Sequence, residues 1–91
     1  MKEFVCNVNL FSLYHSIYLV DYEKNLTEKI ETTDLEELPK VLNYNCQLYN
    51  INKIHLFGEE KGLESLVEEI NTLNTLLHNN ENKIEIEIEV N

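Results

Sequence analysis

The last segment of the chain alternates apolar and charged residues along its whole length. From residue 83 to residue 90 the sequence reads KIEIEIEV, so its aliphatic side chains share one side of an extended strand. Such alternation is typical of a sheet that is covered on one face and open on the other. The side chains expected on the covered face are Ile84, Ile86, Ile88 and Val90, with Glu85, Glu87 and Glu89 on the opposite face.

Three further strands are predicted in the first third of the chain, over residues 3–11, 16–21 and 26–32. The first reversal is expected over 12–15, although this stretch has neither glycine nor proline. The second reversal is expected over 22–25, because asparagine tolerates the left-handed backbone conformation that tight turns require. Three short strands in succession predict an antiparallel arrangement.

A helix is predicted after the third strand. Residues 33–36 (TDLE) have the form of a capping box, in which a hydroxyl and a carboxylate satisfy the free amides of a helix start. Pro39 would remove a hydrogen bond deep inside a helix but is favoured at its first position. We therefore expect one capped turn over 34–38 and a helix from near Pro39 to about Asn50.

The remaining elements are a strand and a second helix. Residues 53–57 form a short apolar segment that Gly58 closes, and aliphatic residues recur at helical spacing over 60–78 with glutamates on the other side. Asn79 and Asn80 are expected to end this helix before the final alternating strand. No linker or repeat divides the sequence, so residues 1–91 are expected to form one domain.

The predicted order is β-β-β-α-β-α-β, which indicates a mixed α/β fold with a single five-stranded sheet and two helices packed on it. This order over residues 3–90 resembles the ribonuclease H-like topology, which implies the spatial strand order 3-2-1-4-5. The two helices then cover either one face of the sheet or one face each. The segments LFS (10–12), IYLVD (17–21) and IHLFG (54–58) also resemble small uncharacterised proteins of Gram-positive bacteria and their phages. That resemblance implies no activity.

The residues argue against an enzyme of either related kind. Ribonuclease H-like nucleases need carboxylates that converge on two divalent metals, but the first strand offers Asn7 and Asn9, and the fourth strand offers Lys53 and His55. Actin-like relatives bind nucleotides through glycine-rich turns, whereas the turn at 58–62 carries two glutamates that repel phosphate. We therefore predict no catalytic, metal or cofactor-binding residue, and a chemical role for His55 is the less favoured interpretation.

Charge restricts the range of partners. The net charge is -10 and the chain has no arginine, which disfavours direct binding to nucleic acid. No apolar run approaches the length of a membrane-spanning helix, so a cytoplasmic protein without membrane contact is expected. Cys6 and Cys46 lack the spacing of a metal site and are expected to be buried free thiols.

Three functional hypotheses follow. The first is a non-enzymatic module that binds a partner protein or assembles with itself, such as an accessory protein of a phage or mobile element. Its contact surface would be the sheet face opposite the helices, which is expected to carry Val5, Phe11, Tyr18, Val20, His55 and Phe57. The alternative is an acidic mimic of nucleic acid that inhibits a basic host protein, and the third hypothesis is an enzyme. The row Glu85, Glu87 and Glu89 is either an anionic interface or, as favoured, a guard against pairing at the sheet edge.

Overall fold

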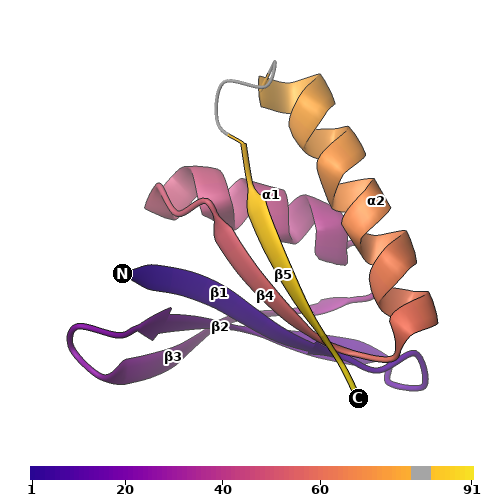
Figure 1. Ribbon diagram of the computed structural model, residues 1–91, viewed down its shortest axis with the longest axis horizontal. Helices are drawn as coiled ribbons and strands as arrows, with labels where there is room; N and C mark the ends of the chain where they lie inside the picture. The colour runs from indigo at the N-terminus through magenta and orange to yellow at the C-terminus, as the bar shows by residue number, and fades with distance from the viewer. Residues whose placement is uncertain (79–82) are drawn as a thin grey trace.

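The computed structural model describes residues 1–78 and 83–91, which form five strands and two helices around one hydrophobic core (Figure 1). The elements, in chain order, are β1 (Lys2–Val8), β2 (Tyr14–Asp21), β3 (Leu26–Asp34), α1 (Leu38–Tyr49), β4 (Lys53–Gly58), α2 (Glu60–His78) and β5 (Glu85–Val90).

The five strands form one mixed sheet in the order β3-β2-β1-β4-β5. β1 pairs antiparallel with β2, and β2 with β3, whereas β4 lies parallel to both β1 and β5. The mixed α/β class and the 3-2-1-4-5 order expected from the sequence are confirmed. β3 and β5 are the two edges of the sheet.

Both helices lie on the same face of the sheet, above it in Figure 1, which decides a point that the sequence left open. α1 connects β3 to β4, and α2 connects β4 to β5, so both connections cross the sheet in the same direction. Right-handed crossovers in one direction place their helices on one face. The opposite face is therefore left without a helix among the described residues.

The covered face of the sheet carries the hydrophobic core, and the predicted row of Ile84, Ile86, Ile88 and Val90 is buried only in part. Cys6, Val8, Ile17, Ile54 and Leu56 are at most 4% exposed and contact leucines of both helices. Ile84, just before β5, is buried and Ile86 is half-buried, but Ile88 is 42% and Val90 54% exposed. The expectation that the whole row is buried was therefore wrong for Ile88 and Val90.

The first reversal occurs earlier than predicted. β1 ends at Val8, because Asn9 organises a turn: its Oδ1 accepts a hydrogen bond from the Phe11 N–H (3.0 Å) and its carbonyl oxygen accepts one from the Ser12 N–H (3.0 Å). Phe11 therefore lies in the β1–β2 loop, 90% exposed, and not on a strand of the sheet as predicted. β2 begins at Tyr14, inside the segment that the sequence assigned to the turn. The second turn matches its prediction, with Asn25 in the left-handed conformation (φ 54°).

A capped turn precedes α1, but Asp34 and not Thr33 provides the cap. The Asp34 Oδ1 accepts a hydrogen bond of 2.8 Å from the Glu37 N–H, and Pro39 then lies in the first turn of the helix, where its missing N–H costs little. At the other end Asn50 adopts a left-handed conformation, and the Ile51 N–H donates to the Cys46 carbonyl (2.9 Å). This closure is the usual helix C-terminal motif.

β4 and α2 lie at the predicted positions, whereas Asn79 and Asn80, predicted to end α2, lie outside the described residues. Two side-chain amides connect the elements: Asn43 donates to the carbonyl of Ile70 on α2 (3.4 Å), and Asn45 donates to Glu31 on β3 (2.7 Å). In the part of the chain that the structure describes, neither helix has both the length and the apolar character needed to cross a membrane.

Candidate interaction surface

The sheet face opposite the helices, called the open face below, carries side chains from all five strands. Strand pairing places Tyr18 opposite Val5, and Val5 opposite His55, so these three residues line up across β2, β1 and β4. The other residues of the predicted surface on this face are Val20, opposite Glu3, and Phe57, opposite Asn7. The predicted set is thus brought together on one face, with the exception of Phe11.

Aromatic and aliphatic groups occupy the middle of the open face. Tyr18 is 37% exposed, whereas Val5, Val20 and Phe57 are half-buried by their neighbours. Tyr14 is 68% exposed. It lies on the same side of β2 as Tyr18, which follows it by four residues. The sequence analysis missed Tyr14, because it assigned this residue to a turn. The i, i+2, i+4 spacing of Tyr14, Ser16 and Tyr18 was the signal that could have placed it.

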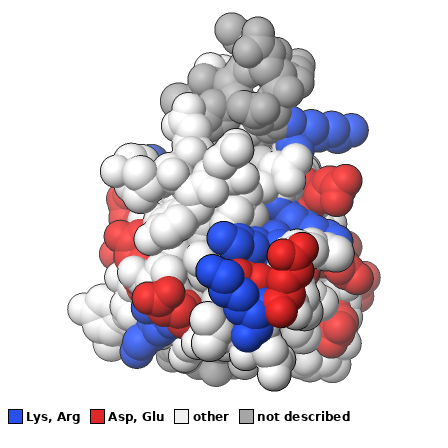
Figure 2. Space-filling view, turned by 90° about the vertical axis from the view of Figure 1, so that its left-hand side faces the viewer, with Lys and Arg blue, Asp and Glu red and all other residues white. Residues whose placement is uncertain are grey.

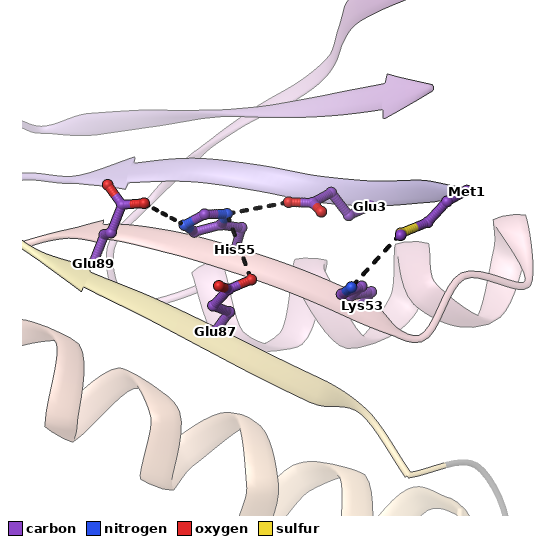
Figure 3. Close-up of polar contacts among 6 residues, drawn as sticks. All are labelled: Met1, Glu3, Lys53, His55, Glu87 and Glu89. Atoms are coloured by element: carbon purple, nitrogen blue, oxygen red, sulfur yellow. Dashed lines mark hydrogen bonds and ion pairs between the residues drawn. The ribbon is translucent and has the colours of Figure 1, made fainter. Parts of the chain in front are cut away.

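Next to these groups, His55 is held between carboxylates from β1 and β5 (Figure 3). Its Nδ1–H donates to Glu3 Oε1 at 3.2 Å, and Glu87 Oε2 lies 4.0 Å from the same nitrogen. Glu89 Oε1 lies 3.4 Å from Nε2, without the geometry of a hydrogen bond. The ring also stacks on Phe57, with centroids 4.4 Å apart and planes 12° apart. His55 thus connects the acidic row of β5 to the apolar centre of the open face.

Glu3 is a partner of His55 that the sequence analysis did not identify. It is only 4% exposed, so its carboxylate has lost most of its water, and the His55 N–H and the Tyr22 side chain are its polar partners. The side chain of Tyr22 also lies near it: reduced contact with solvent, followed by the charge of Glu3, raises the pKa of Tyr22. The alternation of residues 3, 5 and 7 places Glu3 on the open face, but only the β1–β4 register brings it to His55.

The geometry around His55 favours a structural role over a catalytic one. Its Nε2 atom is shielded from solvent, and its Nδ1–H is engaged with the Glu3 carboxylate. Among residues 1–78 and 83–91, no three His, Cys, Asp or Glu side chains are arranged to hold a metal ion.

The two cysteines also do not provide a nucleophile. Both are buried and neither forms a disulfide. Burial raises the pKa of Cys6 and of Cys46 to about 12, so both thiols stay protonated near neutral pH. They act as small apolar side chains of the core.

Replacement of His55 by leucine is expected to lower the free energy of unfolding by about 1–3 kcal/mol, because it removes the imidazole N–H that donates to the buried Glu3 carboxylate. Chemical denaturation followed by circular dichroism measures this loss. The double variant Glu3→Leu/His55→Leu should recover much of it, since both polar partners are then removed together. Equal losses in the single and double variants would show that the pair contributes nothing specific.

Two further large apolar side chains are exposed in the β1–β2 loop. Phe11 is 90% and Leu13 81% exposed, and both precede Tyr14, the first residue of β2. Large apolar side chains at such exposure are costly to leave in water and are typical of contact surfaces. We name the open face together with Phe11 and Leu13 the contact surface.

Comparison of the sequence with protein-family models gave no match, and comparison with curated proteins gave none either.

Proposed function

We propose that this protein acts by binding other protein chains through the contact surface, and that it has no catalytic role. The observation that carries this proposal is the uncovered face of the sheet, on which Tyr14, Tyr18, Val5, Val20 and Phe57 lie with no helix over them among the described residues. A sheet covered on one side usually has a polar second face. An aromatic and aliphatic second face is better explained by a partner that covers it.

The composition of the surface supports this reading in a second way. Tyrosine and phenylalanine supply much contact area for little loss of side-chain entropy, and they are enriched at the centres of protein interfaces. Here Tyr18 and Phe57 lie near the centre of the open face, and acids of β5 lie at one margin. An apolar centre with a charged margin is the arrangement that protein interfaces share.

The alternative, a mimic of nucleic acid, has only the net charge in its favour. A mimic needs a continuous anionic surface, comparable to a row of phosphates. Figure 2 shows lysine side chains among the acids on the side of the molecule that it presents. On the open face, the acids of β5 stand next to an apolar centre and do not continue across it. Protein binding through the apolar centre therefore has the stronger support.

The double substitution Tyr18→Ser/Phe57→Ser is expected to abolish partner binding and leave the fold in place, because it removes the central rings from a face that the core does not use. Two measurements test this: the mass in solution by light scattering, for assembly with a second copy, and affinity purification from the native host at two salt concentrations, for another protein. Circular dichroism melting checks that the variant is folded.

The matched control is Tyr44→Ser/Leu48→Ser, which removes two side chains of α1 that are 62% and 60% exposed. It should change neither the mass nor the set of captured proteins. If the helix variant loses binding and the sheet variant retains it, the contact surface lies on the helices. A wild-type mass equal to one chain, with no protein captured in a Tyr18- and Phe57-dependent way, would refute the proposal.

A further inference from the structure

The outer edge of β5 has a free row of backbone groups. Among residues 1–78 and 83–91, β5 pairs only with β4, in a parallel register from Lys53 opposite Glu85 to Gly58 opposite Val90. The Glu85 N–H donates to Asn52 O (2.7 Å) and the Asn91 N–H donates to Gly58 O (2.9 Å). In a parallel ladder, alternate residues direct both backbone groups toward the same neighbour. The N–H and C=O groups of Ile86, Ile88 and Val90 therefore point away from the sheet.

Side chains on both faces of this edge also lack cover. On the helix side, Ile88 is 42% and Val90 54% exposed. On the open face, the Glu87 and Glu89 side chains are 63% and 64% exposed, and both lie within 4.0 Å of the His55 ring. A strand added beside β5 would bury Ile88 and Val90 further. It would also place its own side chains next to Glu87 and Glu89.

The other edge of the sheet is less suited to such an addition. The pairing of β3 with β2 shifts register between Ile17 and Tyr18, whereas the register of β5 with β4 is regular throughout. Irregularities of this kind twist an edge away from further pairing. β5 is thus the more regular of the two edges.

The acidic row determines which chain can add there. If two copies paired through β5 across a two-fold axis, the sheet would continue and both open faces would lie on the same side. The glutamate rows of the two copies would then stand side by side, and like charges in neighbouring strands destabilise pairing. A basic strand has the complementary charge, and the net charge of -10 attracts it over a longer range.

We propose that the edge of β5 binds an extended segment of another protein in which lysine or arginine alternates with aliphatic residues. The basic residues lie beside Glu85, Glu87 and Glu89, the aliphatic ones contact Ile88 and Val90, and backbone hydrogen bonds form to Ile86, Ile88 and Val90. This inference rests on the proposed function in one respect, that the protein binds other proteins. The acidic row Glu85, Glu87 and Glu89 then has two roles: it binds the basic residues of the partner, and it prevents two copies of this protein from pairing through β5.

The test uses the full chain and a synthetic peptide of sequence KVKIKVK with blocked ends. Its control is a peptide of the same composition in which the alternation is broken, KKVVKIK. Amide hydrogen exchange by NMR is followed at low and at moderate salt. We expect exchange at Ile86, Ile88 and Val90 to slow by about tenfold or more, while Glu87 and Glu89, already bonded to β4, change little. Binding should weaken as salt rises.

Two variants make the test specific. Ile88→Pro removes an outward N–H without breaking the β4 ladder, so it should weaken peptide binding by about tenfold or more at a melting temperature close to that of the wild type. Glu87→Gln/Glu89→Gln should weaken peptide binding and reduce its salt dependence. Glu64→Gln/Glu68→Gln on α2 makes the same change of net charge and should leave peptide binding unchanged.

Absence of saturable binding at about 1 mM peptide, equal binding of both peptides, or protection that does not alternate along β5 would overturn the inference. If the peptide does not bind, but binding of a captured partner is still lost in Tyr18→Ser/Phe57→Ser, the proposed function stands and this inference does not. If the peptide protects β5 and Tyr18→Ser/Phe57→Ser changes no partner, the β5 edge is the contact and the open face is not.

Discussion

Replacement of Phe4 by alanine is expected to lower the free energy of unfolding by about 3–5 kcal/mol. Phe4 is fully buried in β1, the central strand, and its ring contacts that of Tyr49 edge to face, with centroids 5.9 Å apart. Truncation leaves a cavity between the sheet and α1 that surrounding side chains cannot fill. Because small domains have total stabilities of about 5–15 kcal/mol, this one change removes a large share. Urea denaturation measures it.

Phe57→Ala is the matched control, because it makes the same truncation on the open face. Phe57 is half-exposed and contacts His55, so the expected loss is about 1 kcal/mol. If Phe57→Ala cost more than Phe4→Ala, the covered and open faces of the sheet would be the reverse of those described.

Gly58→Ala is expected to lower the free energy of unfolding by roughly 2–4 kcal/mol, the sum of backbone strain and overpacking. Gly58 has a φ of 155°, and a Cβ atom there would lie well inside van der Waals contact of the Val8 carbonyl oxygen on β1. A backbone atom of a central strand cannot move aside as a side chain can. Thermal and chemical denaturation provide the measurement, and strand separation should appear as lost amide protection at the Val8–Gly58 pair.

Gly62→Ala is the internal comparison for that variant. Gly62 lies in the first turn of α2, where a Cβ would come within 3.0 Å of the Leu10 side chain, which is flexible. Alanine favours the helix by about 1 kcal/mol over glycine, so the net change should be small. A loss at position 62 equal to that at position 58 would contradict the assignment of the clash to the β1 backbone.

The fold was predictable because its signals are local and consistent. The alternation of β5, the helical spacing in α2 and the proline near the start of α1 each identify one element, and the resemblance of this element order to the ribonuclease H-like topology implied the strand order. The errors arose where side chains act on the backbone at short range. The Asn9 Oδ1 accepts a hydrogen bond from the Phe11 N–H just after the end of β1, and Asp34 caps the turn assigned to Thr33.

The contact surface was predictable only in part. The period of the strands places Val5, Tyr18, Val20, His55 and Phe57 on one face, given that both helices share the other. Contacts between distant segments were not predictable, because they depend on the register of parallel strands. The Glu3–His55 pair, 52 residues apart in sequence, is the clearest case. The exposure of Ile88 and Val90 was likewise not predictable from the alternation, which gives the face of a strand residue but not how well that face is covered.

Hydroxyl-radical footprinting of the protein, alone and in its complex with a captured partner or a second copy, tests the central claim most directly. The account predicts that oxidation of Tyr18 and Phe57 on the open face falls in the complex, while oxidation of Tyr44 on the outer side of α1 stays unchanged. Protection of Tyr44 with unchanged oxidation of Tyr18 and Phe57 would contradict it, and would place the interface on the helices.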